Sequence, residues 1–306
     1  MPSQPSHRIN HRIIRTASAV TLALGTGLAA PFLLAGTATA AAPEATAAFS
    51  ESDHGILYTA ASGQTNQVTV TASKSAGTEE ITYVIDDAVP VSAGDGCSYP
   101  DSTDRTKVSC TVATLESQDP YATLKLALGD GDDTVSYDNS TDQTYYFARA
   151  ELGDGKDTWN HTGGVDGNSV LGEAGNDDLS VGEAGVVSGG DGNDTLHAAD
   201  GSIAQGGNDN DTIYSDGEES AVDGGAGDDV IQGGAERQNL SGGDGNDRIR
   251  GGAGDDFLYG GKGNDILYGN SGNDTIYGNS GNDELYGGAG QDTLSGGPGT
   301  NIVHQD

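Results

Sequence analysis

The C-terminal part of the chain is an uninterrupted nine-residue repeat. From Gly242 to His304 the unit recurs seven times without a gap. Each unit has glycine at its first and fourth positions and an aliphatic residue at its eighth, and the first six units have aspartate at the sixth. The last unit, GGPGTNIVH, lacks that aspartate. A fixed phase of glycine, carboxylate and aliphatic residue restricts the chain to one repeated local conformation.

Each unit predicts a glycine-rich turn followed by a short strand. Glycine takes the positive φ angles that such a turn needs, and in a strand the eighth residue points inward while its neighbours point outward. Stacked units therefore share one narrow apolar core. Its predicted members in this run are Ile249, Leu258, Leu267, Ile276, Leu285, Leu294 and Val303. A flexible glycine-rich linker is the alternative, but a linker has no reason to keep aliphatic and acidic residues in phase.

Stacking also places the sixth-position aspartates in columns. Carboxylates at the same place on successive turns repel one another unless a cation lies between them. Hard oxygen ligands select calcium, because magnesium retains its waters and softer metals prefer thiolate or imidazole. The unit resembles the hemolysin-type calcium-binding repeat of the RTX proteins, G-G-x-G-x-D-x-U-x. That resemblance implies an all-β fold: a parallel β-roll, or nonapeptide-repeat solenoid, with two units per coil and calcium held by aspartates and turn carbonyls.

The same turn recurs upstream at intervals of roughly one coil, which extends the predicted roll to residues 126–304. The upstream copies begin at Gly224, Gly206, Gly189 and Gly172, and looser copies begin at Leu152 and Leu128. One column of carboxylates then follows a first edge of the roll. Its members are Asp133, Asp157, Asp177, Asp194, Asp211, Asp229, Asp247, Asp265 and Asp283.

Turns on the opposite edge lose the aspartate over much of the roll. Sequences such as AADGSIAQ mostly keep an aliphatic residue, but the sixth-position aspartate returns only from Gly251 onward, as Asp256, Asp274 and Asp292. The aliphatic residues predicted to point inward here are Val170, Val187, Ile203, Val222 and Leu240. Nine aspartates leave eight gaps on the first edge and three leave two on the second, so the sequence predicts about ten calcium ions in this repeat architecture.

The first forty residues have the features of a secretory signal peptide. Basic residues precede a weakly apolar run from Ala17 to Ala35, and small residues lead to Ala41. A membrane anchor is the alternative, which the glycines and the proline of that run weaken. The sequence therefore predicts a secreted, extracellular protein with no membrane span once residues 1–40 are removed.

The negative charge of the chain limits the classes of partner that it can bind. The formal net charge is −34, and removal of Arg8, Arg12 and Arg15 with the signal peptide makes it −37. That surface disfavours nucleic acid and anionic membranes as partners. Low hydrophobicity combined with high charge is typical of a disordered chain. Folding is therefore expected to wait for calcium, whose binding would offset much of the charge.

Residues 43–125 differ from the repeats. Glycines are fewer, and alternating runs such as Gln67–Thr71 and Ile81–Ile85 predict strands. We expect a β-rich cap on the N-terminal end of the roll. Cys97 and Cys110 are the only cysteines, and in an exported protein they are expected to form a disulfide. A loop of that size contributes about 3 kcal/mol of stability.

Neither H-E-x-x-H nor G-x-S-x-G occurs in the chain, and a cap of about 80 residues is smaller than a usual catalytic domain. We predict a calcium-binding protein with a structural or surface-interaction role and not an enzyme; a hydrolase with an unrecognised N-terminal site is one alternative. Outward tyrosines eighteen residues apart, such as Tyr268 and Tyr286, suggest a second alternative, a calcium-dependent adhesin or polysaccharide-binding module whose partner is a cell-surface glycan or protein. Tyrosines that simply cover a strand explain the same pattern.

Overall fold

The computed structural model describes residues 43–305, apart from residues 76, 116–119, 142–145 and 164–166. The predicted signal peptide, residues 1–40, lies outside the described residues. The described part of the chain is all strand, turn and loop, and it forms one compact unit. No helix in it has the length and apolarity needed to cross a membrane.

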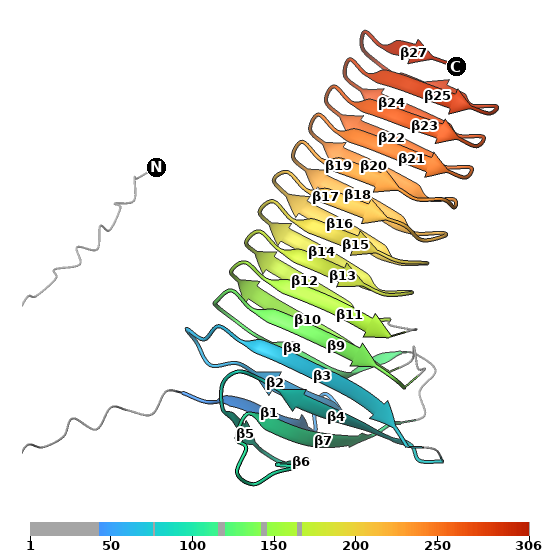
Figure 1. Cartoon of the computed structure of the whole chain (residues 1–306). Coiled ribbons are helices and arrows are strands. Elements are labelled where there is room, and N and C mark those ends of the chain that lie inside the picture. The colour runs from blue at the N-terminus through green and yellow to red at the C-terminus, as the bar shows by residue number, and fades with distance from the viewer. Residues whose placement is uncertain (1–42, 76, 116–119, 142–145, 164–166, 306) are drawn as a thin grey trace, which may run out of the picture. The chain divides into compact units, whose positions relative to one another are not determined.

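Two sheets face each other, and from β8 onward the chain passes from one to the other at every turn (Figure 1). Sheet A contains, in spatial order, β5 (Val91–Ala93), β1 (Ala45–Ser50), β2 (Gly55–Thr59), β8 (Tyr121–Ala127), β10 (Tyr146–Asp154), β12 (Ser169–Ala174), β14 (Val186–Asp191), β16 (Ile203–Asn208), β18 (Ala221–Ala226), β20 (Asn239–Asp244), β22 (Phe257–Lys262), β24 (Thr275–Ser280) and β26 (Thr293–Ser295). From β2 to β26 neighbouring strands are parallel.

Sheet B contains, in spatial order, β6 (Cys97–Ser98), β7 (Lys107–Ala113), β4 (Glu80–Asp86), β3 (Gln67–Lys74), β9 (Thr134–Asn139), β11 (Thr158–Gly163), β13 (Asp178–Val181), β15 (Thr195–Ala198), β17 (Thr212–Ser215), β19 (Val230–Gly233), β21 (Arg248–Ala253), β23 (Ile266–Ser271), β25 (Glu284–Ala289) and β27 (Ile302–His304). Strands from β3 to β27 are parallel to their neighbours. The predicted parallel β-roll is confirmed.

The core follows from the repeat. A strand such as β23 begins at the seventh position of one unit and runs through the first three positions of the next, so the eighth- and first-position residues both point inward. The inward eighth residues Ile249, Leu267 and Leu285 are fully buried and stack in register, eighteen residues apart. Trp159 is also fully buried.

Two predicted core residues are exposed. Ile203 is 45% exposed, and Ala204 takes the inward position instead. The reason is that the segment from the inward Ala198 to the buried Ser202 has five residues, whereas the matching segment of the next coil, Ser215 to Ser220, has six, and this moves the strand by one position. Val303 is 47% exposed because it lies in β27, the last described strand, where no further coil covers it.

Parallel pairing begins upstream of the predicted start of the roll. Strands β2 and β3 pair in parallel with β8 and β9, so residues 55–74 already form a coil. Strands β1, β4, β6 and β7 make the antiparallel pairs of the N-terminal end. The disulfide between Cys97 and Cys110 is present and joins β6 to β7. The division of the chain at residue 125 stays a prediction, since both sheets are continuous across it.

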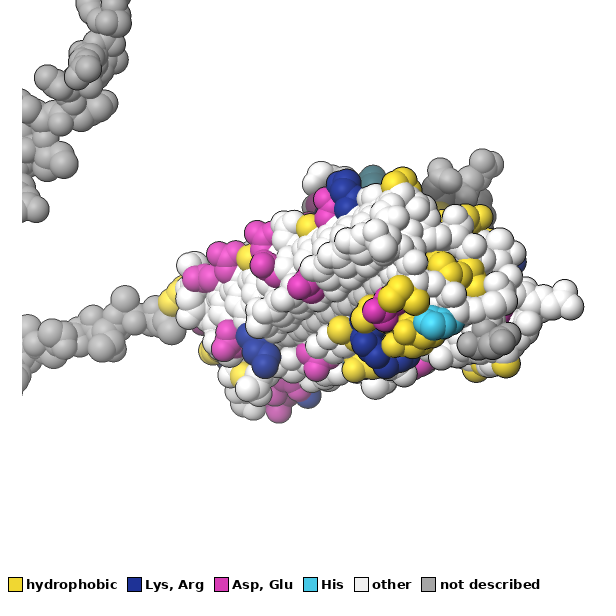
Figure 2. All heavy atoms as spheres, turned by 90° about the horizontal axis from the view of Figure 1, so that it is seen from above, with side chains coloured by type: hydrophobic (Ala, Val, Ile, Leu, Met, Phe, Trp, Pro, Cys, Tyr) yellow, Lys and Arg dark blue, Asp and Glu magenta, His cyan; other side chains and the backbone are white. Residues whose placement is uncertain are grey.

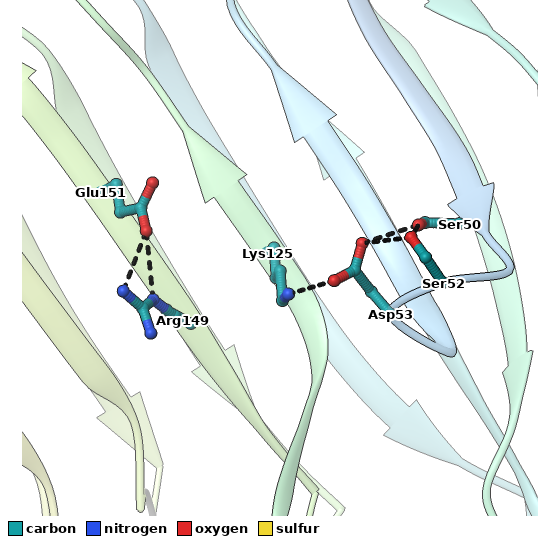
Figure 3. Close-up of polar contacts among 6 residues, drawn as sticks. All are labelled: Ser50, Ser52, Asp53, Lys125, Arg149 and Glu151. Carbon is teal, nitrogen blue, oxygen red and sulfur yellow. Dashed lines mark hydrogen bonds and ion pairs between the residues drawn. The ribbon is translucent and has the colours of Figure 1, made fainter.

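Ion pairs on the outer face of sheet A connect the β1–β2 turn to the roll (Figure 3). Asp53 pairs with Lys125 of β8, and Arg149 pairs with Glu151 along β10, with 3.0 Å between Nη2 and Oε1. The Lys125 ammonium and the Ser50 hydroxyl hold the pKa of Asp53 down at about 2. These groups are exposed, so their contribution to stability is small.

Candidate calcium sites

All twelve predicted aspartates lie in two rows, one along each edge of the roll. In the first row, the main-chain nitrogen of each aspartate donates a hydrogen bond to Oδ1 of the aspartate on the next coil, from Asp133 to Asp283, over 2.8–3.1 Å. The second row repeats the pattern from Asp256 through Asp274 to Asp292. One carboxylate oxygen of each aspartate is therefore used to hold two coils together.

The other carboxylate oxygen, Oδ2, is buried and has no hydrogen-bond partner in any of the twelve aspartates. A buried charged oxygen without a partner is expensive unless a cation lies beside it. Twelve such atoms in two straight rows are a repeated feature of the fold. They are the strongest sign that a cation belongs to these edges.

Each well-formed turn leaves an open space beside that oxygen. We call this space the glycine cradle: it is the place where a Cβ would fall on the first-position glycine. At Gly242 a Cβ would lie 2.6 Å from the carbonyl oxygen of Gly260 on the next coil, and closer still to Oδ2 of Asp247. Both kinds of oxygen border the cradle at eight glycines: Gly172, Gly189, Gly206, Gly224, Gly242, Gly251, Gly260 and Gly269.

The carboxylates behave as buried acids. Burial, opposed by the hydrogen bond from the preceding coil, raises the pKa of Asp157, Asp211 and Asp247 to about 7. Burial likewise raises the pKa to about 6 in a further group: Asp133, Asp194, Asp229, Asp256 and Asp265. Neighbouring carboxylates add to the rise at most of these positions. Without a cation the rows therefore disfavour their own charged form.

The donor set is that of a hard cation. Among the described residues no three histidine, cysteine, aspartate or glutamate side chains converge, so side chains alone do not make a metal site. The oxygens that border each cradle come from one carboxylate and from main-chain carbonyls. Calcium accepts such mixed oxygen ligands in flexible geometry, and magnesium does so reluctantly. The residues present fit calcium.

A comparison with known protein families also indicates calcium binding. Residues 221–237, 241–276 and 268–303 match the family model described as the RTX calcium-binding nonapeptide repeat, in four copies. The repeats of residues 221–303 are RTX repeats. Because RTX repeats bind calcium, the chain is a calcium-binding β-roll protein. No curated protein matches the chain.

Two coils upstream of the RTX repeats depart from the glycine cradle. In the coils of Asp133 and Asp157 the first position is leucine, and both Leu128 and Leu152 are buried. Leu152 lies level with Gly172 in the sheet, since Glu151 pairs with Leu171 and Gly153 with Glu173. A leucine Cβ occupies the space that glycine leaves open, so these two coils lack a cradle of the RTX type.

Two turns of the second edge upstream of Gly251 use hydroxyl groups where the first edge has carboxylates, whereas the buried Nδ2 of Asn168, farther upstream on this edge, has no partner. The Ser202 hydroxyl donates to the Gly182 carbonyl over 2.9 Å, and the Ser220 hydroxyl donates to the Gly217 carbonyl over 3.1 Å. Ser220 also bonds to Ser215, which stands at the first position of its turn. Hydroxyl groups thus donate to turn carbonyls here, and none of the buried carboxylate oxygens without a partner lies in these two turns.

Sequence reasoning missed the amide residues at the ends of the rows. Asn66 precedes Asp133 in the first row, with its main-chain nitrogen 2.6 Å from Oδ1 of Asp133, and Asn301 follows Asp283. Gln238 precedes Asp256 in the second row. The only available signal at Asn66 is the aliphatic Val68 two residues later, because the turn before it lacks the first- and fourth-position glycines.

Proposed function

We propose that this chain is a secreted protein whose RTX roll folds on binding calcium and then acts as a structural or surface-interaction element, not as an enzyme. The observation that carries the proposal is the double row of buried Oδ2 atoms without partners. Each such atom destabilises the folded chain until a cation reaches it. The binding of calcium then supplies the free energy that holds the coils together.

We further propose eight calcium sites, which refines the ten gaps counted between aspartates. Six first-edge gaps, from Asp177 to Asp283, and both second-edge gaps begin at a glycine cradle bordered by a carbonyl of the next coil. The two remaining gaps, after Asp133 and after Asp157, begin at Leu128 and Leu152. Calcium at those two positions would need the leucine side chains to move out of the core, which a packed interior resists.

Secretion fits the same picture. The cap carries a disulfide, a bond that persists in oxidising compartments. Extracellular calcium is abundant enough for weak oxygen sites with dissociation constants of roughly 0.1–1 mM. A roll whose buried carboxylates are neutralised by calcium only outside the cell remains unfolded during export.

The adhesin or polysaccharide-binding alternative rests on the tyrosine ladder of β23, β25 and β27. Tyr268 stacks on Tyr286 and Tyr286 stacks on His304, with ring centroids 4.8 and 4.7 Å apart and planes 10° from parallel. Because the ring faces cover one another, the ladder presents mainly its edges to solvent. Sugar rings pack on exposed aromatic faces, so the stacking favours a covering role for these side chains over a glycan site.

Circular dichroism of the mature chain tests the proposal. We expect a coil spectrum in excess chelator and a strand spectrum as calcium rises through roughly 0.1–1 mM. Magnesium at the same concentration is the control and should leave the coil spectrum. A strand spectrum that persists in chelator would contradict calcium-dependent folding.

A further inference from the structure

Gln238 stands at the point where the second row of calcium sites begins. It occupies the sixth position of its turn, it is buried, and its main-chain nitrogen donates to Oδ1 of Asp256 over 2.9 Å. The aspartates within the row make the same bond to the next coil. Gln238 is thus a member of the row in backbone geometry, but it carries no charge.

The side-chain amide of Gln238 is satisfied inside the protein. Its Nε2 donates to the Gly217 carbonyl over 3.1 Å, and its Oε1 accepts from the main-chain nitrogen of Gly234 over 3.3 Å. The row aspartates instead leave Oδ2 without a partner. An NH2 group that donates to a turn carbonyl does the electrostatic work that a bound cation does for the neighbouring coils.

The turn of Gln238 has kept its glycine cradle. A Cβ at Gly233 would lie 2.8 Å from Oε1 of Gln238 and closer to the carbonyl oxygen of Gly251. The preceding turn on this edge has lost the cradle, because Ser215 replaces the glycine and bonds to Ser220. The turn of Gln238 therefore still holds the space and the next-coil carbonyl of a calcium site, and it lacks the carboxylate.

The first row ends in the same way at Asn301. Its Oδ1 accepts from the main-chain nitrogen of Asp283 over 2.8 Å, and its Nδ2 donates to the Gly297 carbonyl over 3.0 Å. A Cβ at Gly296 would lie 2.5 Å from that Nδ2, where the other turns bring Oδ2. An amide therefore takes the place of the carboxylate at the N-terminal end of the second row and at the C-terminal end of the first row.

We propose that Gln238 sets the N-terminal boundary of the second row of calcium sites, because its amide takes the place of a calcium ion at this turn. We call such a residue an uncharged stop. The inference rests on the proposed function, since it concerns the number of ions that the same roll binds. It assigns the boundary between the calcium-bound and the calcium-free stretch of the second edge to one side chain, at a turn whose cradle is otherwise ready for an ion.

Native mass spectrometry of the mature chain at saturating calcium counts the ions. Gln238→Asp should hold one ion more than the wild type, and so should the double variant that also carries Glu236→Gly, which restores the fourth-position glycine. Ser220→Asp is the matched control: it adds a carboxylate on the same edge, but Ser215 fills the cradle, so the count should stay unchanged. An unchanged count in both Gln238 variants, or a gained ion in Ser220→Asp, would overturn the inference.

Gln238→Ala gives an independent measurement. The count should stay at the wild-type value while the calcium-loaded roll unfolds at a lower temperature, because the Gly217 carbonyl loses one of its two side-chain donors and the Gly234 nitrogen loses its acceptor. Loss of an ion would instead show that Gln238 is a ligand, which contradicts a stop. A wild-type chain that holds no calcium would overturn the proposed function itself, and the two failures are therefore distinguishable.

Discussion

The two edges of the roll solve the same packing problem with different chemistry. Both must bring successive turns within hydrogen-bonding distance. The first edge does so with aspartates whose Oδ2 atoms remain without partners, and the second edge between Val181 and Gln238 does so with hydroxyls and an amide that donate to main-chain carbonyls. A cation is thus needed along one edge and not along this stretch of the other. Calcium dependence is a property of the turns and not of the coil.

The largest effect is expected from the first edge itself. Asp265 takes part in two gaps, because its nitrogen donates to Asp283 and its Oδ1 accepts from Asp247. At calcium 100-fold above the dissociation constant each site stabilises by about 2.7 kcal/mol, so Asp265→Ala should cost roughly twice that. Glu236→Ala, in the degenerate second-edge turn, should cost less than about 0.5 kcal/mol. Calcium-dependent thermal unfolding measures both, and equal losses would erase the distinction between the edges.

Filling a cradle is expected to have the next largest effect. Gly242→Ala places a methyl group 2.6 Å from the Gly260 carbonyl and closer to Asp247, so it should remove one calcium ion and destabilise by about 1–3 kcal/mol through overpacking. Ser215→Ala changes the same position on the second edge and should leave the ion count unchanged. A Gly242→Ala chain that binds as many ions as the wild type would show that the cradle is not the site.

A fall in pH should stabilise the folded roll when calcium is absent and should weaken calcium-induced folding when calcium is present. Burial raises the pKa of Asp211 and Asp247 from 3.8 to about 7 in the metal-free fold. The folded state then holds more protons than the unfolded state between about pH 4 and 7, so the metal-free roll gains stability as pH falls through that window and loses it as pH rises. With calcium present, protons compete for the same oxygens, and the calcium midpoint should rise at pH 5.

Circular dichroism at pH 5 and pH 7.5, in chelator and in calcium titrations, measures both signs. More strand signal in chelator at pH 5 than at pH 7.5 is the expected result. A calcium midpoint that does not move with pH would mean that the buried carboxylates are not the ligands.

The smallest effect is expected on the outward face of sheet B. Arg248 and Arg250 lie over the Tyr268 ring, at 5.3 and 5.6 Å from its centroid. Figure 2 shows basic, acidic, hydrophobic and histidine side chains gathered together on one side of the molecule. Replacing Tyr268 and Tyr286 with serine should cost about 1 kcal/mol per lost cross-strand pair and leave the ion count intact. Attachment to polysaccharide that is abolished by this change would favour the adhesin alternative over the structural role.

The sequence was informative wherever the period was strict. The sixth-position aspartates and eighth-position aliphatics predicted the two rows and the core, since a fixed period of eighteen residues per coil leaves one arrangement. Prediction failed where the period broke. A five-residue turn moved Ile203 outward, and the first coil was missed because Asn66 and Val68 are almost all that remain of the pattern there.

The effect of a single replacement within the repeat on a calcium site also could not be predicted from the sequence. Leucine at position 128 or 152 looks like a tolerable variant of the first glycine, but only the structure shows that a Cβ there fills the space beside the carboxylate. Gln238 is hidden for the same reason: its amide matters through its contacts with Gly217 and Gly234, which lie in separate turns.

A crystal structure of the calcium-loaded chain, with the ions located by their anomalous scattering, tests the central claim most directly. The account predicts one calcium ion beside each of the eight glycine cradles, from Gly172 to Gly269, and none along the second edge between Val181 and Gln238. Calcium along that second-edge stretch, or a first edge without calcium between Gly206 and Gly278, would contradict it.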